Sequence, residues 1–417
     1  MDLFTVLAII LGLSALFSYI NERLLHLETS IGLMVLALGL SVVLAILNAF
    51  GVVDYIDAER RFLSKLNLGE TLLNGVLCFM LFAGSVNVKL KFLSQEKWPI
   101  GSLVFGATII AWLLIGGLLW GVAVLLGLGI APIYLFLFGA LIAPTDPIAA
   151  LAILGRMGLP DRLEAIINGE SLFNDGVGVV LFTMCLAIAV NPVQPTAGEA
   201  VILFLREVLG GVALGLCAAL LMNQMLQRSQ DYGTQLLVSL GIVTLGYALA
   251  LHIEVSGPIA MVVAGLVIGN FTRPKMADQV RARFDDFWHG IDEILNAMLF
   301  VVIGLNVVLV QPVEGVPAAI IAIVVCLIAR AISVYVPISL LCLTSALKAD
   351  ALGLTKLLTW GGLRGGLALA LALSIPDVPE KASILYMTYA VVTFSIIVQG
   401  LTIGRFFKPA ALERLVR

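Results

Sequence analysis

The sequence predicts an all-α polytopic membrane protein with about thirteen transmembrane helices, and two observations carry this prediction. The first is composition: 61% of the 417 residues are hydrophobic and only 12% are charged, whereas a soluble domain is about 25% charged. The second is a succession of apolar runs long enough to cross a bilayer. The net charge of −3 gives no indication of a nucleic-acid partner. The five cysteines form no CxxC pair and indicate neither a disulfide framework nor a metal site.

Each apolar run is expected to form one helix that crosses the lipid bilayer. In chain order the runs cover residues 3–20, 31–47, 70–88, 99–126, 131–155, 163–190, 199–225, 234–251, 256–270, 291–310, 316–343, 354–374 and 383–404. The first run is not preceded by a basic residue, so it is expected to be a spanning helix and not a signal peptide. The longest loops are expected at 48–69 and 271–290, and no separate soluble domain is expected.

The positions of Lys and Arg predict the orientation. Loops after odd-numbered runs, together with the C-terminal tail, hold seventeen of the 24 basic residues, and loops after even-numbered runs hold four. Short cytoplasmic loops carry the excess of positive charge. We therefore expect a multi-pass protein of the cell (inner or plasma) membrane, with the N-terminus outside and the C-terminus in the cytoplasm.

Two of the runs are expected to be broken in the middle. The fifth contains Pro144 and Pro147, and each proline removes a backbone donor and clashes with the preceding helical turn. The twelfth contains four glycines around Arg364. Irregular backbone at membrane depth is tolerated only where it is packed in protein or lines a cavity. Runs five and twelve are seven apart, and broken helices at corresponding positions of two inverted halves indicate the binding site of a transporter.

Five ionisable residues are expected near the middle of membrane spans: Asp146, Glu170, Asp175, Arg330 and Arg364. A charge at the bilayer centre costs about 2.5–3.5 kcal/mol even on the most lenient insertion scale, so these residues require partners. Three acids and two bases leave one carboxylate over, which a single Na⁺, K⁺ or H⁺ would neutralise. The other charges in or near spans, including Glu207, Asp292 and Glu293, are expected at helix ends, where long side chains reach water.

The sixth run combines two i, i+4 pairs on neighbouring helix faces. Ser171 and Asp175 offer a hydroxyl and a carboxylate, which are the oxygen ligands that hard cations prefer. Thr145 and Asp146 of the broken fifth run are expected to complete this Na⁺ site. Glu170 and Asn174 form the second pair. We expect Glu170 to pair with a deep arginine, Arg330 or Arg364, and Asn174 to form a hydrogen bond across the interface.

These motifs resemble the cation/proton antiporter superfamily, in its NhaP and Na⁺/H⁺-exchanger branch. The resemblance rests on the segments 145–147, 169–176 and 361–366, and Arg330 matches the arginine of that branch's eleventh helix. It covers nearly the whole chain and implies inverted six-helix repeats with two crossed broken helices. One departure is the stretch 81–84, where some relatives carry an acid and this chain has Ala83.

The resemblance also implies a division into moving and static parts. It implies an ion-binding core subdomain at about 99–190 and 316–404, a dimerisation subdomain at about 3–88 and 234–310, and a linker helix at about 199–225. The core is expected to move by an elevator-like alternating-access mechanism within a homodimer.

The resemblance assigns roles to the deep residues as well. Asp175 would carry either the cation or the proton, helped by Asp146, Ser171 and Thr145. Glu170, Asn174, Arg330 and Arg364 would be structural or charge-compensating. Asn174, which precedes Asp175, is the mark of electroneutral one-for-one exchange in that branch.

The predicted function is therefore secondary transport, not enzymatic catalysis, and no cofactor is expected. The chain is expected to exchange Na⁺ (or Li⁺) for H⁺. A K⁺/H⁺ antiporter of the same family is the nearest alternative. A cation channel is a more distant one, because no filter-like carbonyl run is visible. An intramembrane aspartyl protease is also distant, since Asp146 and Asp175 lack a GxGD arrangement.

Overall fold

The structure is a computed structural model that describes residues 3–51, 75–190, 197–229, 231–306, 315–344, 347, 349–407, 412 and 415. Within these residues the chain is helical, and Asp146 and Leu363 form an isolated β-bridge. The first-half helices are α1 (Leu3–Ile20), α2 (Thr29–Ala49), α5 (Leu77–Val86), α6 (Leu90–Gln95), α7 (Lys97–Gly101), α8 (Thr108–Leu125), α9 (Pro132–Ile142), α10 (Ile148–Arg156) and α11 (Asp161–Val190). The second-half helices are α12 (Ala197–Arg228), α13 (Tyr232–His252), α14 (Gly257–Val267), α15 (Asp278–Asn306), α16 (Gly315–Leu343), α17 (Ala351–Gly361), α18 (Gly366–Ser374), α19 (Lys381–Phe394) and α20 (Gly400–Phe406).

Short stretches of π-helix or, for η5, of 3₁₀-helix continue several of these elements. They are η1 (Asn21–Leu25), η3 (Ser102–Ala107), η4 (Ile268–Thr272), η5 (Arg273–Lys275) and η6 (Ser395–Gln399). Through η3, helices α7 and α8 form one spanning unit, and through η6 the same holds for α19 and α20.

The structure confirms the predicted fold class. Nine helical stretches in the described part of the chain are long and apolar enough to cross a membrane. The remaining four predicted runs correspond to α5, to α9 with α10, to α14 with η4, and to α17 with α18. Three parts of the prediction lie outside the described residues. They are the beginning of the third run (70–74), the end of the tenth run (307–310) and most of the predicted loop 48–69.

One predicted loop is wrong. Residues 271–290 were expected to connect two spans, but α15 already begins at Asp278 and continues to Asn306. The first half of α15 is rich in charged residues, so it is not apolar enough to stand out as a membrane span. A helix needs apolar residues only on the face that packs, and Phe284 and Trp288 provide that face because both are fully buried.

Both predicted helix breaks are present, and they contact each other. Helix α9 ends at Ile142 and α10 begins at Ile148, while α17 ends at Gly361 and α18 begins at Gly366. The backbone N–H of Asp146 donates to the carbonyl oxygen of Leu363 at 2.7 Å. This contact satisfies one of the backbone groups that the breaks release, which is the condition for irregular backbone inside a membrane.

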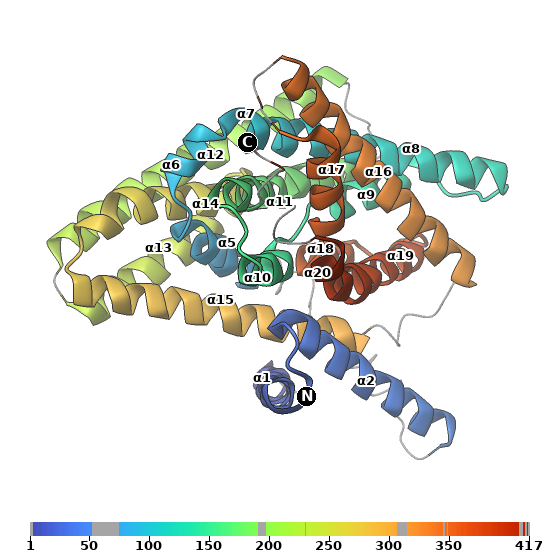
Figure 1. The fold of residues 1–417 in the computed structure, drawn as a ribbon, viewed down its shortest axis with the longest axis horizontal. Coiled ribbons are helices and arrows are strands. Elements are labelled where there is room, and N and C mark those ends of the chain that lie inside the picture. The colour runs from blue at the N-terminus through green and yellow to red at the C-terminus, as the bar shows by residue number, and fades with distance from the viewer. Residues whose placement is uncertain are drawn as a thin grey trace.

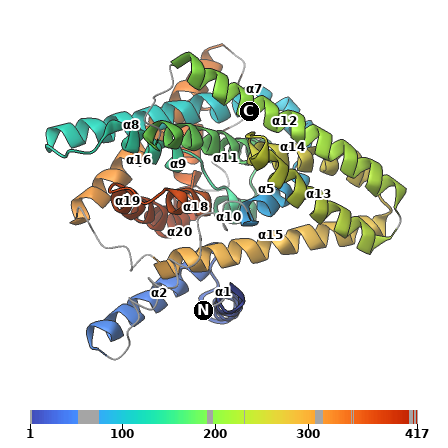
Figure 2. The same ribbon diagram turned by 180° about the vertical axis from the view of Figure 1, so that it is seen from behind.

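The helices form two groups on either side of these breaks (Figures 1 and 2). On one side, the long helix α15 packs against α2 and α5, while α14 packs against α5, α12 and α13. On the other side, α8 packs against α9 and α16, and α16 packs against α17 and α19. Apart from α12, which covers the predicted linker helix, these groups contain helices of the predicted dimerisation and core subdomains, whose functional division stays a prediction.

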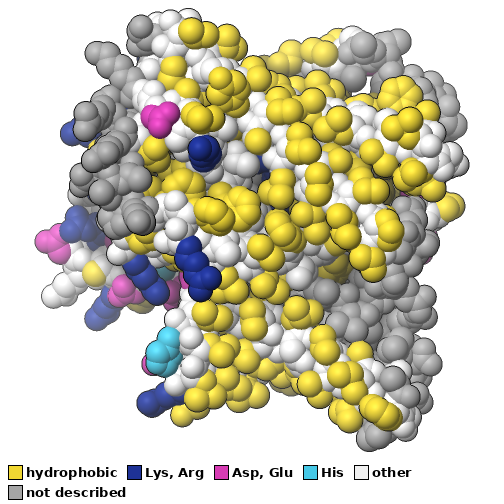
Figure 3. All heavy atoms as spheres, turned by 45° about the vertical axis from the view of Figure 1, so that its right-hand side comes forward, with side chains coloured by type: hydrophobic (Ala, Val, Ile, Leu, Met, Phe, Trp, Pro, Cys, Tyr) yellow, Lys and Arg dark blue, Asp and Glu magenta, His cyan; other side chains and the backbone are white. Residues whose placement is uncertain are grey.

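The surface has the character expected of a protein in lipid. Hydrophobic side chains cover most of the face drawn in Figure 3, and charged side chains gather along one edge of it. Large apolar residues are exposed along the sides of the spanning helices, for example Leu209, Leu237 and Ile320. Because lipid tails solvate such side chains, this exposure carries no cost in a bilayer.

Candidate ion-binding site

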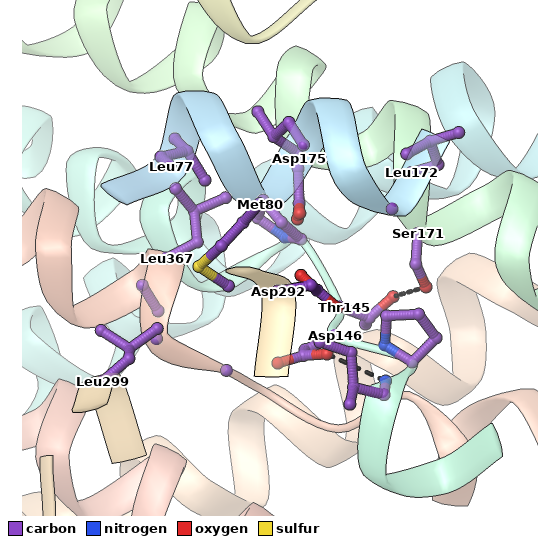
Figure 4. A pocket seen from close by; sticks show the side chains of 18 of the residues that line it. Leu77, Met80, Thr145, Asp146, Ser171, Leu172, Asp175, Asp292, Leu299 and Leu367 are labelled. Carbon is purple, nitrogen blue, oxygen red and sulfur yellow. Dashed lines mark hydrogen bonds between the residues drawn. The ribbon is translucent and has the colours of Figure 1, made fainter. Parts of the chain in front are cut away.

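A cavity of about 240 Å³ lies where the two helix breaks meet α11. Helices α5 and α15 close it from the other helix group (Figure 4). Its polar lining residues are Thr145, Asp146, Asn168, Ser171, Asp175 and Asp292. None of the described residues that line it is Lys or Arg. The cavity therefore collects acidic and neutral oxygen ligands without a resident counter-charge.

The four predicted cation ligands meet in this cavity. The hydroxyls of Thr145 and Ser171 are 3.3 Å apart and both residues are buried. The carboxylates of Asp146 and Asp175 line the same space. The structure thus brings the fifth-run break and α11 together as the sequence predicted, while the cation-binding role of these residues stays a prediction.

Asn174 holds the first break against α11. Its side-chain amide donates to the Thr145 hydroxyl oxygen at 3.0 Å, and its Oδ1 lies 3.5 Å from the backbone N–H of Thr145. Asn174 is fully buried. Because both ends of the amide bind Thr145, this asparagine fixes the threonine hydroxyl that faces Ser171.

The Asp146 carboxylate accepts a hydrogen bond from the start of α10, directly after its own break. The N–H of Ile148 donates to Asp146 Oδ1 at 2.9 Å. Gly365 of the other break lies directly beside this carboxylate, and a Cβ on Gly365 would be 2.2 Å from Asp146 Oδ2. Only glycine permits this approach, so the sequence of one break determines the room available to the acid of the other.

The open choice of partner for Glu170 is resolved in favour of Arg330. Arg330 Nη1 lies 2.5 Å from Glu170 Oε1, and both side chains are at least 96% buried. The remaining guanidinium nitrogens, Nε and Nη2, donate to the carbonyl oxygen of Leu358 at 3.3 and 3.2 Å. The pair joins α11 to α16, and the contact to Leu358 adds α17 just before its break.

Arg364 binds backbone carbonyl oxygens and not a carboxylate. Its guanidinium donates to the carbonyl oxygens of Ala143 and Pro144, which the first helix break leaves free. Its backbone N–H donates to the Ser395 hydroxyl at 3.0 Å. A buried cation thus compensates the unpaired carbonyl dipoles of one break from the centre of the other.

Sequence reasoning missed one acid of the cavity. Asp292 was expected at a helix end because the tenth apolar run begins at residue 291, but it lies in the middle of α15 and lines the cavity. Figure 4 draws Asp175, Asp146 and Asp292 around the same space. The sequence does contain a signal for the earlier start of this helix. Phe284 and Trp288, upstream of Asp292, are large apolar residues four positions apart, as expected on one buried face of a helix. The inventory of five deep charges was therefore incomplete.

The third helix, α5, places no acid in the cavity wall, in line with the lack of an acid in residues 81–84. The residues that α5 contributes to the cavity are Leu77, Met80, Leu81 and Gly84, none of which is acidic. Ala83 is buried and does not line the cavity. In the described residues, the acid on this side of the cavity comes from α15.

The chain matches the family model of the transmembrane sodium/hydrogen exchanger over residues 8–408. It belongs to the sodium/hydrogen exchanger family. Within this family, the Na⁺/H⁺ antiporter NhaP of Pseudomonas aeruginosa is 41% identical over 417 residues, which cover 98% of each chain. The Na⁺/H⁺ antiporter NhaH of Halobacillus dabanensis is 32% identical and is matched over 85% of this chain and 87% of its own.

The exchanger fold is also the fold of a solved relative. The sodium proton antiporter MjNhaP1 of Methanocaldococcus jannaschii superposes with a TM-score of 0.76 over 99% of this chain and 98% of its own, at 19% identity. At this identity the likeness supports the fold and not the details of the site. The family membership makes the chain a membrane transporter.

Proposed function

We propose that this exchanger transports Na⁺ (or Li⁺) in one direction and H⁺ in the other. The observation that carries the proposal is the cavity in which Asp175, Asp146, Ser171 and Thr145 converge without Lys or Arg. A desolvated carboxylate needs a cation, and either a metal ion or a proton satisfies it. The curated relatives named as Na⁺/H⁺ antiporters support Na⁺ over K⁺.

Asp175 is the proposed carrier because it has the fewest competing interactions. Glu170 is neutralised by Arg330 at 2.5 Å, and Asp146 accepts a backbone N–H at 2.9 Å. When Na⁺ occupies the site, Ser171, Thr145 and Asp146 supply further oxygen ligands. When a proton occupies it, the carboxyl group is neutral and the metal site is lost. Because one carboxylate holds one of two monovalent cations, each cycle exchanges one Na⁺ for one H⁺ and moves no net charge.

The proposed transport cycle is elevator-like. Ser171 and Asp175 on α11, and Asp146 in the first helix break, belong to the predicted core subdomain. Helices α5 and α15 of the predicted dimerisation subdomain form the opposite wall of the cavity. Movement of the core along that wall would present the cavity to each side of the membrane in turn. We further propose a homodimer in the cell membrane, with the N-terminus outside and the C-terminus in the cytoplasm.

The direct test is cation-driven dissipation of a pH gradient in proteoliposomes that contain the purified protein. Na⁺ and Li⁺ should dissipate the gradient, and K⁺ should do so weakly or not at all. Dissipation by K⁺ at equal or lower concentration would instead identify the K⁺/H⁺ antiporter. A cation current that persists without proton movement would indicate a channel.

A further inference from the structure

We propose that Asp292 is a positioning residue that holds the cation in one conformational state before Asp175 binds it, an inference that rests on the proposed function. Asp292 lies on α15, across the cavity from α11 and the helix breaks. Its side chain is half-buried, as are those of Asp146 and Asp175. An acid in this place attracts a cation into the cavity from the wall opposite Asp175.

The surroundings of Asp292 leave its charge available to a cation. In the described residues it forms no ion pair. His289, one turn before it, lies 3.4 Å from Glu293 instead. Asn296, one turn after it, is 95% buried and donates its amide to Asp292, and its Oδ1 has no partner among the described residues. Asn296 does not line the cavity, so the Asp292 carboxylate remains open to a cation on its cavity side.

Asp292 acts before Asp175 and not as a third acid beside Asp146 and Asp175. Among the described residues, no three His, Cys, Asp or Glu side chains are close enough to hold one metal ion together, so these three aspartates do not form a single metal site. The two acids also lie on opposite helix groups, so an elevator movement of the core would carry Asp175 away from Asp292. Asp292 therefore raises cation affinity only in the state that the structure shows.

The test is a comparison of the KM for Na⁺ on the two sides of the membrane, in vesicles of defined orientation. Asp292→Asn should raise this KM by roughly 10-fold on one side, as loss of a supporting group does for a metal site, and leave it nearly unchanged on the other. Asp292→Glu should restore the wild-type value. The control is Glu293→Gln, because the neighbouring Glu293 side chain is 69% exposed and does not line the cavity.

A second variant moves the acid to another helix of the same wall. Gly84 on α5 lines the cavity, and a Cβ built there meets nothing within 4 Å. Gly84→Asp combined with Asp292→Asn should lower the raised KM toward the wild-type value. This rescue would not occur if Asp292 served only to stabilise the fold.

Two results would overturn the inference: an unchanged KM on both sides, or an equal rise on both. Absence of exchange by the wild-type protein would instead contradict the proposed function, so the two failures are distinct. If Asp292→Asn does not fold, Asp292→Ser also removes the charge and is measured in its place.

A different part of the molecule carries a second, independent inference. An apolar groove of about 670 Å³ runs between α6, α7 and η3 on one side and α11, α12 and α14 on the other. This volume falls within the 300–1,000 Å³ typical of ligand pockets. Its walls are formed by side chains such as Val104, Phe173, Val177, Val212 and Val263, while Lys91 and Lys97 line one end.

We propose that this groove binds an anionic phospholipid, with an acyl chain between the helices and the phosphate at the two lysines. Lys91 and Lys97 are exposed, and Trp98, which is 65% exposed, marks the depth of the membrane interface. From Lys97 to Phe105 the chain descends about 12 Å as a helix, along the length of the groove. Glu96 does not cancel the positive charge, because it is paired with Arg162 at 2.5 Å.

The experiment measures equilibrium binding of fluorescent phosphatidylglycerol to the purified protein in detergent, with unlabelled phosphatidylglycerol, phosphatidylcholine and inorganic phosphate as competitors. Phosphatidylglycerol should compete well, and the other two should compete poorly. Lys91→Gln with Lys97→Gln should weaken binding about 25-fold, since each lysine near an anionic headgroup contributes about a fivefold change in affinity. The matched control removes two exposed lysines outside the groove, Lys275→Gln with Lys356→Gln.

Filling the groove tests the acyl chain separately. Gly101 lines the groove and has open space at its Cβ position, so Gly101→Leu should block binding. Gly241→Leu, at an equally open glycine on α13, should not. Equal competition by phosphatidylcholine, or full binding to the Gly101 variant, would overturn this proposal.

Discussion

At the residue scale, the buried charges have separate partners, and these partners distinguish structural from transport residues. Glu170 binds Arg330, and Arg364 binds the carbonyl oxygens of Ala143 and Pro144. Asp175 has no such partner among the described residues and lines the cavity. Because an unpaired buried charge is costly, the first two groups are expected to support stability and Asp175 to require its transported cation.

Asp175→Asn is expected to abolish exchange and to leave the fold intact. The amide has nearly the same shape as the carboxylate, but it carries no negative charge to neutralise Na⁺ and it does not titrate. The measurement is Na⁺-driven dissipation of a pH gradient, with thermal stability recorded on the same sample. Asp377→Asn, at a fully exposed position, is the control. Retained dissipation by the Asp175 variant would refute its role as the carrier.

Glu170→Ala is expected to damage stability before it affects ion binding. It leaves Arg330 buried without its counter-charge, and breaking a buried ion pair costs about 3–5 kcal/mol. The double variant Glu170→Gln with Arg330→Met should recover part of this loss, because no unpaired charge remains. Thermal unfolding in detergent measures both variants. A Glu170→Ala protein as stable as the wild type would contradict the structural assignment.

At the element scale, the two helix breaks form one unit. The Asp146 N–H bonds to the Leu363 carbonyl oxygen, and Arg364 returns two bonds to the carbonyl oxygens of the first break. A glycine lies at each closest approach: a Cβ at Gly178 would be 2.1 Å from Pro144, and one at Gly365 would be 2.2 Å from Asp146. The spacing of the breaks, and hence the position of Asp146, depends on these glycines.

Gly365→Ala is expected to displace the Asp146 carboxylate and to raise the KM for Na⁺ roughly 10-fold. Gly361→Ala is the matched control in the same break, because its added Cβ would approach nothing closer than 3.4 Å. Initial rates of Na⁺-driven proton movement give the KM of each variant. Similar KM values for the two variants would show that the close approach of Gly365 to Asp146 has no importance for binding.

At the scale of the whole molecule, the cavity lies between two helix groups. The number of Na⁺ and H⁺ ions that it exchanges in each cycle determines how transport responds to pH and voltage. Competition of H⁺ and Na⁺ for one carboxylate predicts that the apparent KM for Na⁺ rises about tenfold for each pH unit on the acidic side, because a metal ligand must be deprotonated. The maximal rate at saturating Na⁺ should change little with the same shift, since saturating Na⁺ displaces the proton.

One-for-one exchange also predicts that an imposed membrane potential leaves the rate unchanged. Proteoliposomes with a K⁺ diffusion potential of either sign provide the measurement, and the same vesicles without the ionophore are the control. A rate that follows the voltage would mean that net charge moves in each cycle, in which case Asp292 or Asp146 would also exchange protons.

The sequence alone determined the number and order of the spans, both helix breaks and the acids on α11. These features are local: apolar length, two prolines, a glycine cluster and i, i+4 spacing are all visible within one segment. Only the tertiary structure decided that Glu170 binds Arg330, that Arg364 binds backbone carbonyls, and that Asp292 reaches the cavity. These facts depend on which helices lie side by side, and residues up to 221 positions apart in the chain meet there. The charged beginning of α15 forms no apolar run, so its helix could not be predicted from apolar length. Its buried face is formed only when α5 packs against it.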